Sequence, residues 1–156
     1  MIEDLLTFFN YEKIYHFANI GVIPCWLLLI FLPNHIITKF FVKSIIIPLI
    51  LSTAYLFIVY QIFIGENLFD IFGLYLGLDN LYAIFSSEAF LLIFWLHFLA
   101  LSLFVGNWIV SDSATYSIPR LFVILSLLTT YFTGPVGLIF YWIIRVFYSR
   151  KINYYD

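Results

Sequence analysis

The sequence predicts an all-α, multi-pass integral membrane protein that forms a single membrane domain over residues 1–156. Four apolar runs without Asp, Glu, Lys or Arg support this class, because about 20 helical residues cross a bilayer core about 30 Å thick. Hydrophobic residues make up 64% of the chain and charged residues only 10%, which is too little polar surface to cover a soluble globule. The predicted transmembrane spans are residues 14–34, 44–64, 89–111 and 121–144.

Prolines interrupt three of the four predicted spans. Pro24 lies in the middle of the first span, Pro48 early in the second, and Pro135 follows Gly134 in the fourth. A proline inside a helix removes one backbone hydrogen bond and tends to kink the helix, which membranes tolerate where neighbouring helices satisfy the freed carbonyl. Such kinks are either an ordinary feature of membrane helices or a means of opening a ligand cleft. We expect structural roles for Pro24, Gly106, Gly134 and Pro135.

The connector between the second and third spans, residues 66–87, has the pattern of an amphipathic helix. Its large apolar residues recur at three- and four-residue steps, whereas Asp70 and Asn80 follow the opposite face. Two aspartates make the segment a poor fifth span. It also lacks Lys and Arg, so attraction to anionic lipid cannot hold it at the surface. We expect this segment to rest at the membrane interface or to cap the helix bundle.

Charge and cysteine content exclude several kinds of partner. The formal net charge of -2 leaves no basic patch for a phosphate backbone, so we predict no nucleic-acid partner. The single cysteine, Cys25, cannot form an intrachain disulfide or a CxxC site, and we predict no metal site and no cofactor. Residues 1–13 are acidic, unlike the basic start of a cleaved signal peptide. The even division of Lys and Arg leaves the membrane orientation open.

His97 is an ionisable side chain near the middle of the third span. Such a group is costly in lipid when charged, so we expect it to face the bundle interior and find a partner. It either forms an interhelical hydrogen bond or takes part in ligand binding or proton transfer. Aromatic residues on its face suit a flat apolar ligand that carries an oxygen, although such stripes also pack ordinary cores. The residues we expect to contact such a ligand are Trp26, Phe94, Trp95, Ser102, Asn107, Trp108 and Tyr131.

Glu88 and Asp112 flank the third span and complete the candidate catalytic set with His97. Along a helix, Glu88 is about 13 Å and Asp112 about 22 Å from His97, so neither carboxylate can touch the imidazole. An acid–base pair with His97 therefore has to reach across helices. The sequence leaves open which residue supplies the partner: the candidates are Tyr131 and Thr133, beside the Gly134-Pro135 kink, and Tyr60 and Gln61 in the second span.

Several motifs occur in a characteristic order along nearly the whole chain. They are I-P-C-W followed by L-P-N (residues 23–34), F-S-S-E (85–88), W-L-H-F-L-A-L-S-L-F-V-G (95–106) and G-P-V-G (134–137). With them the chain resembles a bacterial-type member of the abscisic acid-deficient family, small integral membrane proteins of neoxanthin synthesis. The resemblance implies a four-span fold and, in plants, conversion of violaxanthin to neoxanthin. That isomerisation opens an epoxide and forms an allene, and it needs an acid and a base.

The sequence departs from the family pattern at two positions. The family block reads like W-I-H-x-L-x-x-D-L-F, with an acidic residue where this chain has Ser102, and arginine is common where it has Asn107. His97 is retained, but the intramembrane carboxylate is not. If that carboxylate is the base of the family, this chain cannot carry out the same reaction. The positions that do match include Glu88, Asp112, Gly134 and Pro135.

These observations lead to one main functional hypothesis and one alternative. The main hypothesis is an integral membrane protein, in a bacterial inner membrane or an equivalent, that binds and isomerises a carotenoid or other isoprenoid lipid. As an enzyme it would resemble a carotenoid epoxide isomerase. The alternative is a non-catalytic scaffold or assembly protein. The expected partners are membrane lipid, an isoprenoid ligand and further copies of the chain.

Overall fold

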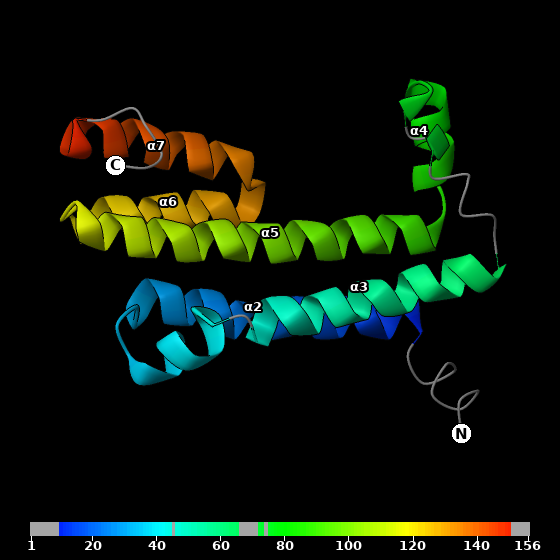
Figure 1. The fold of residues 1–156 in the computed structure, drawn as a ribbon, viewed down its shortest axis with the longest axis horizontal. Coiled ribbons are helices and arrows are strands. Elements are labelled where there is room, and N and C mark those ends of the chain that lie inside the picture. The colour runs from blue at the N-terminus through cyan, green and yellow to red at the C-terminus, as the bar shows by residue number, and fades with distance from the viewer. Residues whose placement is uncertain (1–9, 45, 66–71, 74, 151–156) are drawn as a thin grey trace. The chain divides into compact units, whose positions relative to one another are not determined.

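The computed structural model describes residues 10–44, 46–65, 72–73 and 75–150, without the side chains of 63–65. Every regular element in these ranges is a helix, which confirms the predicted all-α class. Figure 1 shows the helices, which are α2 (Tyr11–Phe31), a π-helix η1 (Thr38–Val42), α3 (Ile46–Gly65), α4 (Leu78–Phe85), α5 (Glu88–Thr115), α6 (Arg120–Thr133) and α7 (Pro135–Ser149).

Three long apolar helices fit a membrane protein by length and composition. Helix α2 starts behind Asn10, whose Oδ1 accepts a hydrogen bond from the Lys13 N–H at 2.9 Å and so caps the helix. It continues through Pro24 and ends at Phe31, shortly before Pro33. In the part of the chain that the structure describes, three segments are long enough to cross a membrane: Tyr11–Phe31, Thr38–Ile62 and Glu88–Thr115.

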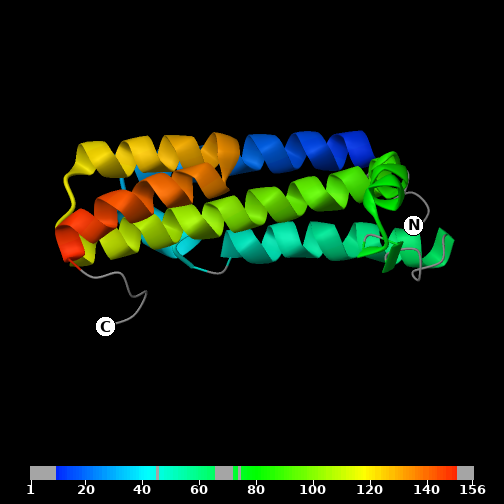
Figure 2. The ribbon, with the colours of Figure 1, turned by 90° about the horizontal axis from the view of Figure 1, so that it is seen from above.

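The predicted fourth span, residues 121–144, is wrong as a single helix. It is divided between α6, of 14 residues, and α7, of 15 residues. At about 1.5 Å per residue each is roughly 21 to 23 Å long, which is short of a bilayer core of about 30 Å. The two helices lie side by side as a hairpin (Figures 1 and 2). Gly134 and Pro135 therefore reverse the chain, whereas the sequence indicated a kink.

The Gly134-Pro135 pair ends one helix and starts the next. Gly134 has φ 58° and ψ -90°, a backbone conformation that side chains disfavour, and its N–H donates to the Thr130 carbonyl at 2.8 Å. Pro135 cannot continue α6, but its fixed φ suits the first position of α7. Two positions later, a Cβ on Gly137 would collide with the backbone of Thr130. Glycine at 137 thus allows the two helices to approach closely.

The chain divides into two compact units, which we describe separately. One comprises Met1–Gly21 and Leu49–Ala100, and the other comprises Val22–Pro48 and Leu101–Asp156. Helices α2, α3 and α5 each contribute to both units, and a single membrane domain stays a prediction. In the second unit the α6–α7 hairpin packs with the last turns of α5. The fully buried side chains of this second unit include Leu103, Ile109, Leu127, Thr130, Tyr141 and Arg145.

The predicted amphipathic segment is helical over only part of its described length. Helix α4 covers Leu78–Phe85 and follows Gly77, which has φ 144°. None of its side chains is buried. Residues 66–71 and 74 of the predicted segment lie outside the described residues.

Candidate functional site

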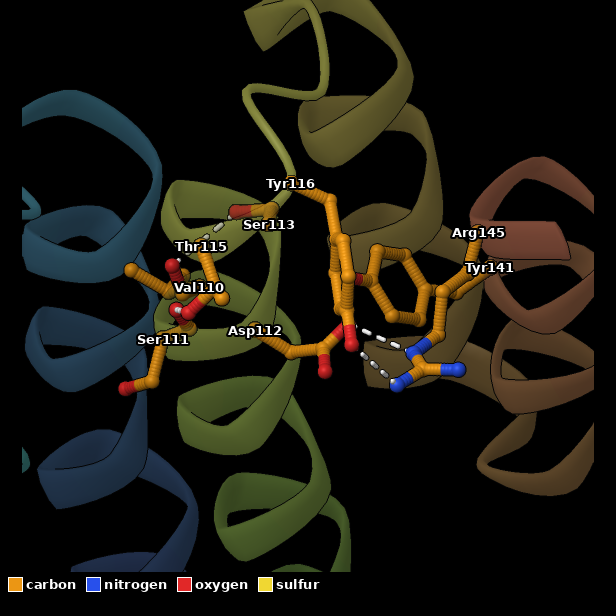
Figure 3. Close-up of polar contacts among 8 residues, drawn as sticks. All are labelled: Val110, Ser111, Asp112, Ser113, Thr115, Tyr116, Tyr141 and Arg145. Carbon is orange, nitrogen blue, oxygen red and sulfur yellow. Dashed lines mark hydrogen bonds and ion pairs between the residues drawn. The ribbon is translucent and has the colours of Figure 1, made fainter. Parts of the chain in front are cut away.

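A polar cluster of buried and half-buried side chains forms where the end of α5 meets α7. Residues four apart on a helix share a face, so Asp112 and Tyr116 project together, as do Tyr141 and Arg145. Tyr116 follows the last residue of α5, and its N–H still donates to the Asp112 carbonyl at 3.2 Å, which continues the helical turn. Figure 3 shows these four side chains converging. We refer to them as the Asp112 cluster.

The Asp112 carboxylate is the centre of this cluster. Arg145 Nε donates to Asp112 Oδ2 at 2.9 Å, and the Tyr141 hydroxyl donates to the same oxygen at 2.6 Å. Arg145 Nη2 donates to the Tyr116 hydroxyl at 3.2 Å. Among the described residues, no donor reaches the other carboxylate oxygen, Oδ1. Asp112 therefore keeps one oxygen available while the other is held by two donors.

The Arg145 guanidinium lies between two aromatic rings. Its Cζ atom is 4.7 Å from the centroid of the Tyr116 ring and 5.0 Å from that of the Trp142 ring. Trp108 stacks on Trp142, with ring centroids 6.1 Å apart. The Arg145 side chain is only 1% exposed and the Asp112 side chain 11%. Burying such an ion pair is unfavourable unless further hydrogen bonds and ring contacts compensate, and this cluster supplies both.

The cluster combines the groups that acid–base chemistry requires. Asp112 Oδ1 can accept a proton or a hydrogen bond. The Tyr116 hydroxyl oxygen accepts from Arg145, so its own proton is available to a different acceptor. A cationic donor on a phenol oxygen stabilises the phenolate that forms when the proton leaves. Nearby Ser113 and Thr115 donate to carbonyls of α5 at 2.9 and 3.4 Å and do not join the cluster (Figure 3).

Three of the predicted site residues form a second group in the same unit. The rings of Trp26 and Tyr131 meet edge to face, with centroids 5.5 Å apart. A Cβ on Gly106 would lie 2.8 Å from two atoms of the Trp26 ring, so glycine leaves the space that this ring fills. The structure therefore brings Trp26, Gly106 and Tyr131 together, although they come from three helices.

His97 lies outside both groups. Its side chain is exposed on α5, so the expectation that it faces the interior is wrong, and it has no hydrogen-bond partner among the described residues. Neighbouring Phe94 is 51% exposed and meets Phe85 edge to face. Trp95 is half-buried and donates from Nε1 to Asn19 Oδ1 at 3.2 Å. Glu88 is exposed at the start of α5.

The remaining predicted residues have separate surroundings. Ser102 is buried in α5. Asn107 is half-buried, and its Oδ1 is a buried oxygen without a hydrogen-bond partner among the described residues. Trp108 joins the Asp112 cluster through its edge-to-face contact with Tyr141, at a centroid distance of 5.2 Å. Of the three predicted catalytic residues, only Asp112 is held by other polar side chains.

Tyr116, Tyr141 and Arg145 were missed by the sequence reasoning. Arg145 falls just past the predicted fourth span, where a cation usually reaches water, so its sequence position suggested no burial. The available signal was spacing. Asp112 and Tyr116, and Tyr141 and Arg145, are polar pairs four residues apart, each of which places two polar groups on one helix face.

A comparison with protein families found a match over most of the chain. The family model described as ABA DEFICIENT 4-like matches residues 13–141, which includes Asp112, Tyr116 and Tyr141 and ends four residues before Arg145. The comparisons with curated proteins and with solved structures found no match. Since the matched region is most of the sequence, the chain belongs to the ABA4-like family, as its motifs indicated.

Proposed function

We propose that this member of the ABA4-like family binds a carotenoid or other isoprenoid lipid and isomerises it at the Asp112 cluster. We further propose that it acts as a multi-pass protein of a bacterial inner membrane or an equivalent membrane. The observation that carries the proposal is a guanidinium, Arg145, that donates both to the half-buried Asp112 carboxylate and to the Tyr116 phenol, while the Tyr141 phenol donates to the same carboxylate.

The chemistry of the cluster and its surroundings supports an isoprenoid as the ligand. Apolar and aromatic side chains favour a hydrocarbon body, while the cluster can accommodate a terminal oxygen. Arg145 is paired with Asp112, so its charge is already compensated and does not favour a negatively charged substrate. An isoprenoid with an epoxide or hydroxyl on an end group meets both conditions. The resemblance to neoxanthin synthesis points to the same class.

An epoxide isomerisation can be balanced with the residues of the cluster. The Tyr116 proton is transferred to the epoxide oxygen as a C–O bond breaks, which leaves a hydroxyl on the product. Asp112 Oδ1 takes a proton from a nearby carbon, and the electron pair of that C–H bond forms the new double bond. The net change is an isomerisation, so it needs no oxidant or reductant. Proton return from Asp112 to Tyr116 restores the starting state.

Arg145 and Tyr141 act through Asp112 and Tyr116 in this scheme. Both hold Asp112 Oδ2, which fixes the direction of the free oxygen. Arg145 also bonds the Tyr116 hydroxyl, so one guanidinium orients the acid and the base together. We assign positioning roles to Arg145 and Tyr141, and catalytic roles to Tyr116 and Asp112.

The test is expression in a carotenoid-producing host, followed by an absorption spectrum of the purified protein and chromatography of the extracted pigments. Tyr116→Phe removes only the hydroxyl, and Tyr148→Phe is a matched control on the exposed side of α7. We expect the wild type and Tyr148→Phe to retain pigment and form product. Tyr116→Phe should retain pigment, but product formation should fall by about 100-fold or more, the usual contribution of a general acid.

Two outcomes would contradict the proposal. A well-folded wild type that carries no pigment and forms no product would exclude a carotenoid ligand. Equal product formation by wild type and Tyr116→Phe would remove Tyr116 as the acid. Asp112→Asn provides a second variant, since it keeps the shape of the carboxylate but cannot accept the carbon-bound proton. Its folding is checked first by size-exclusion chromatography, because it also weakens the contact with Arg145.

A non-catalytic scaffold is the second candidate function. The observation that favours it is the number of large apolar side chains left exposed on the last helices, such as Leu121, Phe132 and Phe147, each more than 60% exposed. Such side chains can pack against another membrane protein as well as against lipid. A scaffold is expected to purify with protein partners and without pigment, so the same preparation separates the two functions.

A further inference from the structure

Five large apolar side chains are exposed on α4 and the turn that precedes it. They are between 66% and 86% exposed, far more than a side chain that packs in a protein core. We call this group the α4 patch. Its members are Phe72, Tyr75, Leu76, Leu78 and Tyr82.

One flank of α4 is attached to its own unit. Phe85 meets Phe94 of α5 edge to face, with ring centroids 5.1 Å apart, and Ile84 lies against Gly73. Leu81, Ile84 and Phe85 are accordingly half-buried, whereas Leu78 and Tyr82, four residues apart, share a face that no described residue covers. Helix α4 is therefore fixed on one side and open on the other.

Chain connectivity indicates what covers the open side. The segment joins the end of α3 to the start of α5, and both helices belong to candidate membrane spans. A connector between consecutive spans lies at the level of the membrane surface. Two members of the patch are tyrosines, whose ring is apolar and whose hydroxyl is polar, and this residue type is enriched where acyl chains meet headgroups.

The charges near the patch decide the kind of lipid. Residues 66–88 contain four acidic residues, among them Asp79 in the first turn of α4, and no Lys or Arg. Electrostatic attraction to anionic lipid is therefore absent, and burial of apolar side chains supplies the binding free energy. Zwitterionic headgroups suffice for such a surface.

We infer that the α4 patch binds the membrane surface, with Leu78 and Tyr82 inserted at the boundary between acyl chains and headgroups and with no requirement for anionic lipid. The inference does not depend on the proposed isomerase function. It assigns α4 a lipid contact instead of a contact with another protein.

Depth measurements with spin labels test this inference. Single cysteines at Tyr82→Cys and at Asn80→Cys, on the opposite face of α4, are introduced with the buried Cys25 replaced by alanine. The full-length protein is placed in nanodiscs of phosphatidylcholine, with or without phosphatidylglycerol. We expect the label at 82 to collide with oxygen and to lie about 5 to 10 Å below the headgroup region, the usual depth of interfacial helices. The label at 80 should collide with an aqueous nickel chelate.

Each alternative result contradicts the inference in a recognisable way. A label at 82 that is as accessible to the nickel chelate as the label at 80 would show that α4 stands in water. A label at 82 that neither reagent reaches would show that protein covers the patch. Insertion only in the presence of phosphatidylglycerol would contradict the charge argument. Leu78→Cys gives an independent measurement on the same face if Tyr82→Cys does not fold.

Discussion

His97 and Asp112 occupy the same helix but differ in almost every other respect. Both are polar residues in a mostly apolar helix, and both were catalytic candidates on sequence grounds. In the structure His97 is exposed and has no polar partner among the described residues, whereas Asp112 binds Tyr141 and Arg145. A polar residue within a membrane helix is thus a candidate site only when other polar side chains converge on it.

The difference follows from which helices pack against each part of α5. The last turns of α5 meet α7, which contributes two polar side chains at a four-residue spacing. The exposed face around His97 has apolar neighbours, of which Phe94 and Leu101 are each 51% exposed. We expect this contrast to appear in the free energy of unfolding of single variants, with the largest loss at the Asp112 cluster and the smallest at His97.

Removal of the buried Arg145 cation should cause the largest loss in the free energy of unfolding. Arg145→Met keeps much of the side-chain volume but leaves the Asp112 charge with Tyr141 as its one remaining donor among the described residues. Removing one partner of a buried ion pair lowers the free energy of unfolding by about 3 to 5 kcal/mol. We expect this loss in chemical unfolding of the detergent-solubilised protein, followed by tryptophan fluorescence. Arg150→Met, at an exposed position just after α7, is the matched control.

The double variant Asp112→Asn with Arg145→Met tests whether the loss in Arg145→Met comes from the uncompensated charge of Asp112. If the loss comes from an uncompensated charge, removing both charges should recover a large part of the stability lost in Arg145→Met. A double variant as unstable as the sum of the single variants would show that the two residues act independently.

The next largest effect should come from Gly137→Ala, which acts on the helix that carries Tyr141 and Arg145. The added Cβ would meet the Thr130 backbone, so α7 has to move away from α6. Overpacking of this kind costs about 1 to 3 kcal/mol. Gly21→Ala is the control, because its Cβ meets nothing within 4 Å and alanine favours the helix. Equal stability of the two variants would contradict the close approach of α6 and α7.

Replacement of Arg120 should have an intermediate effect on the free energy of unfolding, because this cation is held by backbone carbonyls instead of a carboxylate. Its Nη2 donates to the carbonyls of Ile30 at 3.3 Å and Phe31 at 2.6 Å, at the end of α2. A cation there also interacts favourably with the helix dipole. We expect Arg120→Gln to lower the free energy of unfolding by about 1 kcal/mol. A loss as large as that of Arg145→Met would mean that burial of the ion pair adds little.

His97→Leu should have the smallest effect. An exposed side chain without a polar partner is expected to change the free energy of unfolding by no more than about 0.5 kcal/mol. The measurement is the same unfolding curve, compared with wild type and Arg145→Met. A loss above about 1 kcal/mol, typical of a broken hydrogen bond, would show that His97 has a polar partner. The stated difference between His97 and Asp112 would then be wrong.

The fourth predicted span shows where reasoning from the sequence reached its limit. Residues 121–144 have the length and hydropathy of a span, and Gly134 and Pro135 were recognised as a break. Whether a helix bends or reverses at such a break depends on contacts beyond it. Here Gly137 allows close packing on Thr130, and this contact accompanies the reversal. The local pattern is compatible with both outcomes.

The candidate site was predictable only in part. Asp112 was selected as a carboxylate at the end of an apolar run, and the group of Trp26, Gly106 and Tyr131 contains three residues selected for ligand or structural roles. The partners of Asp112 were not selected, because a buried arginine just beyond a predicted span resembles a cation that extends to water.

The sequence by itself determined the all-helical fold, the positions of the long apolar helices and the family. These follow from hydropathy, length and local motifs, which are properties of contiguous residues. Only the tertiary structure decided that α6 and α7 form a hairpin, that Arg145 is buried against Asp112, and that His97 is exposed. Those features depend on the rotation and packing of helices that are distant in the chain, and small residues and shared hydrogen bonds determine that packing.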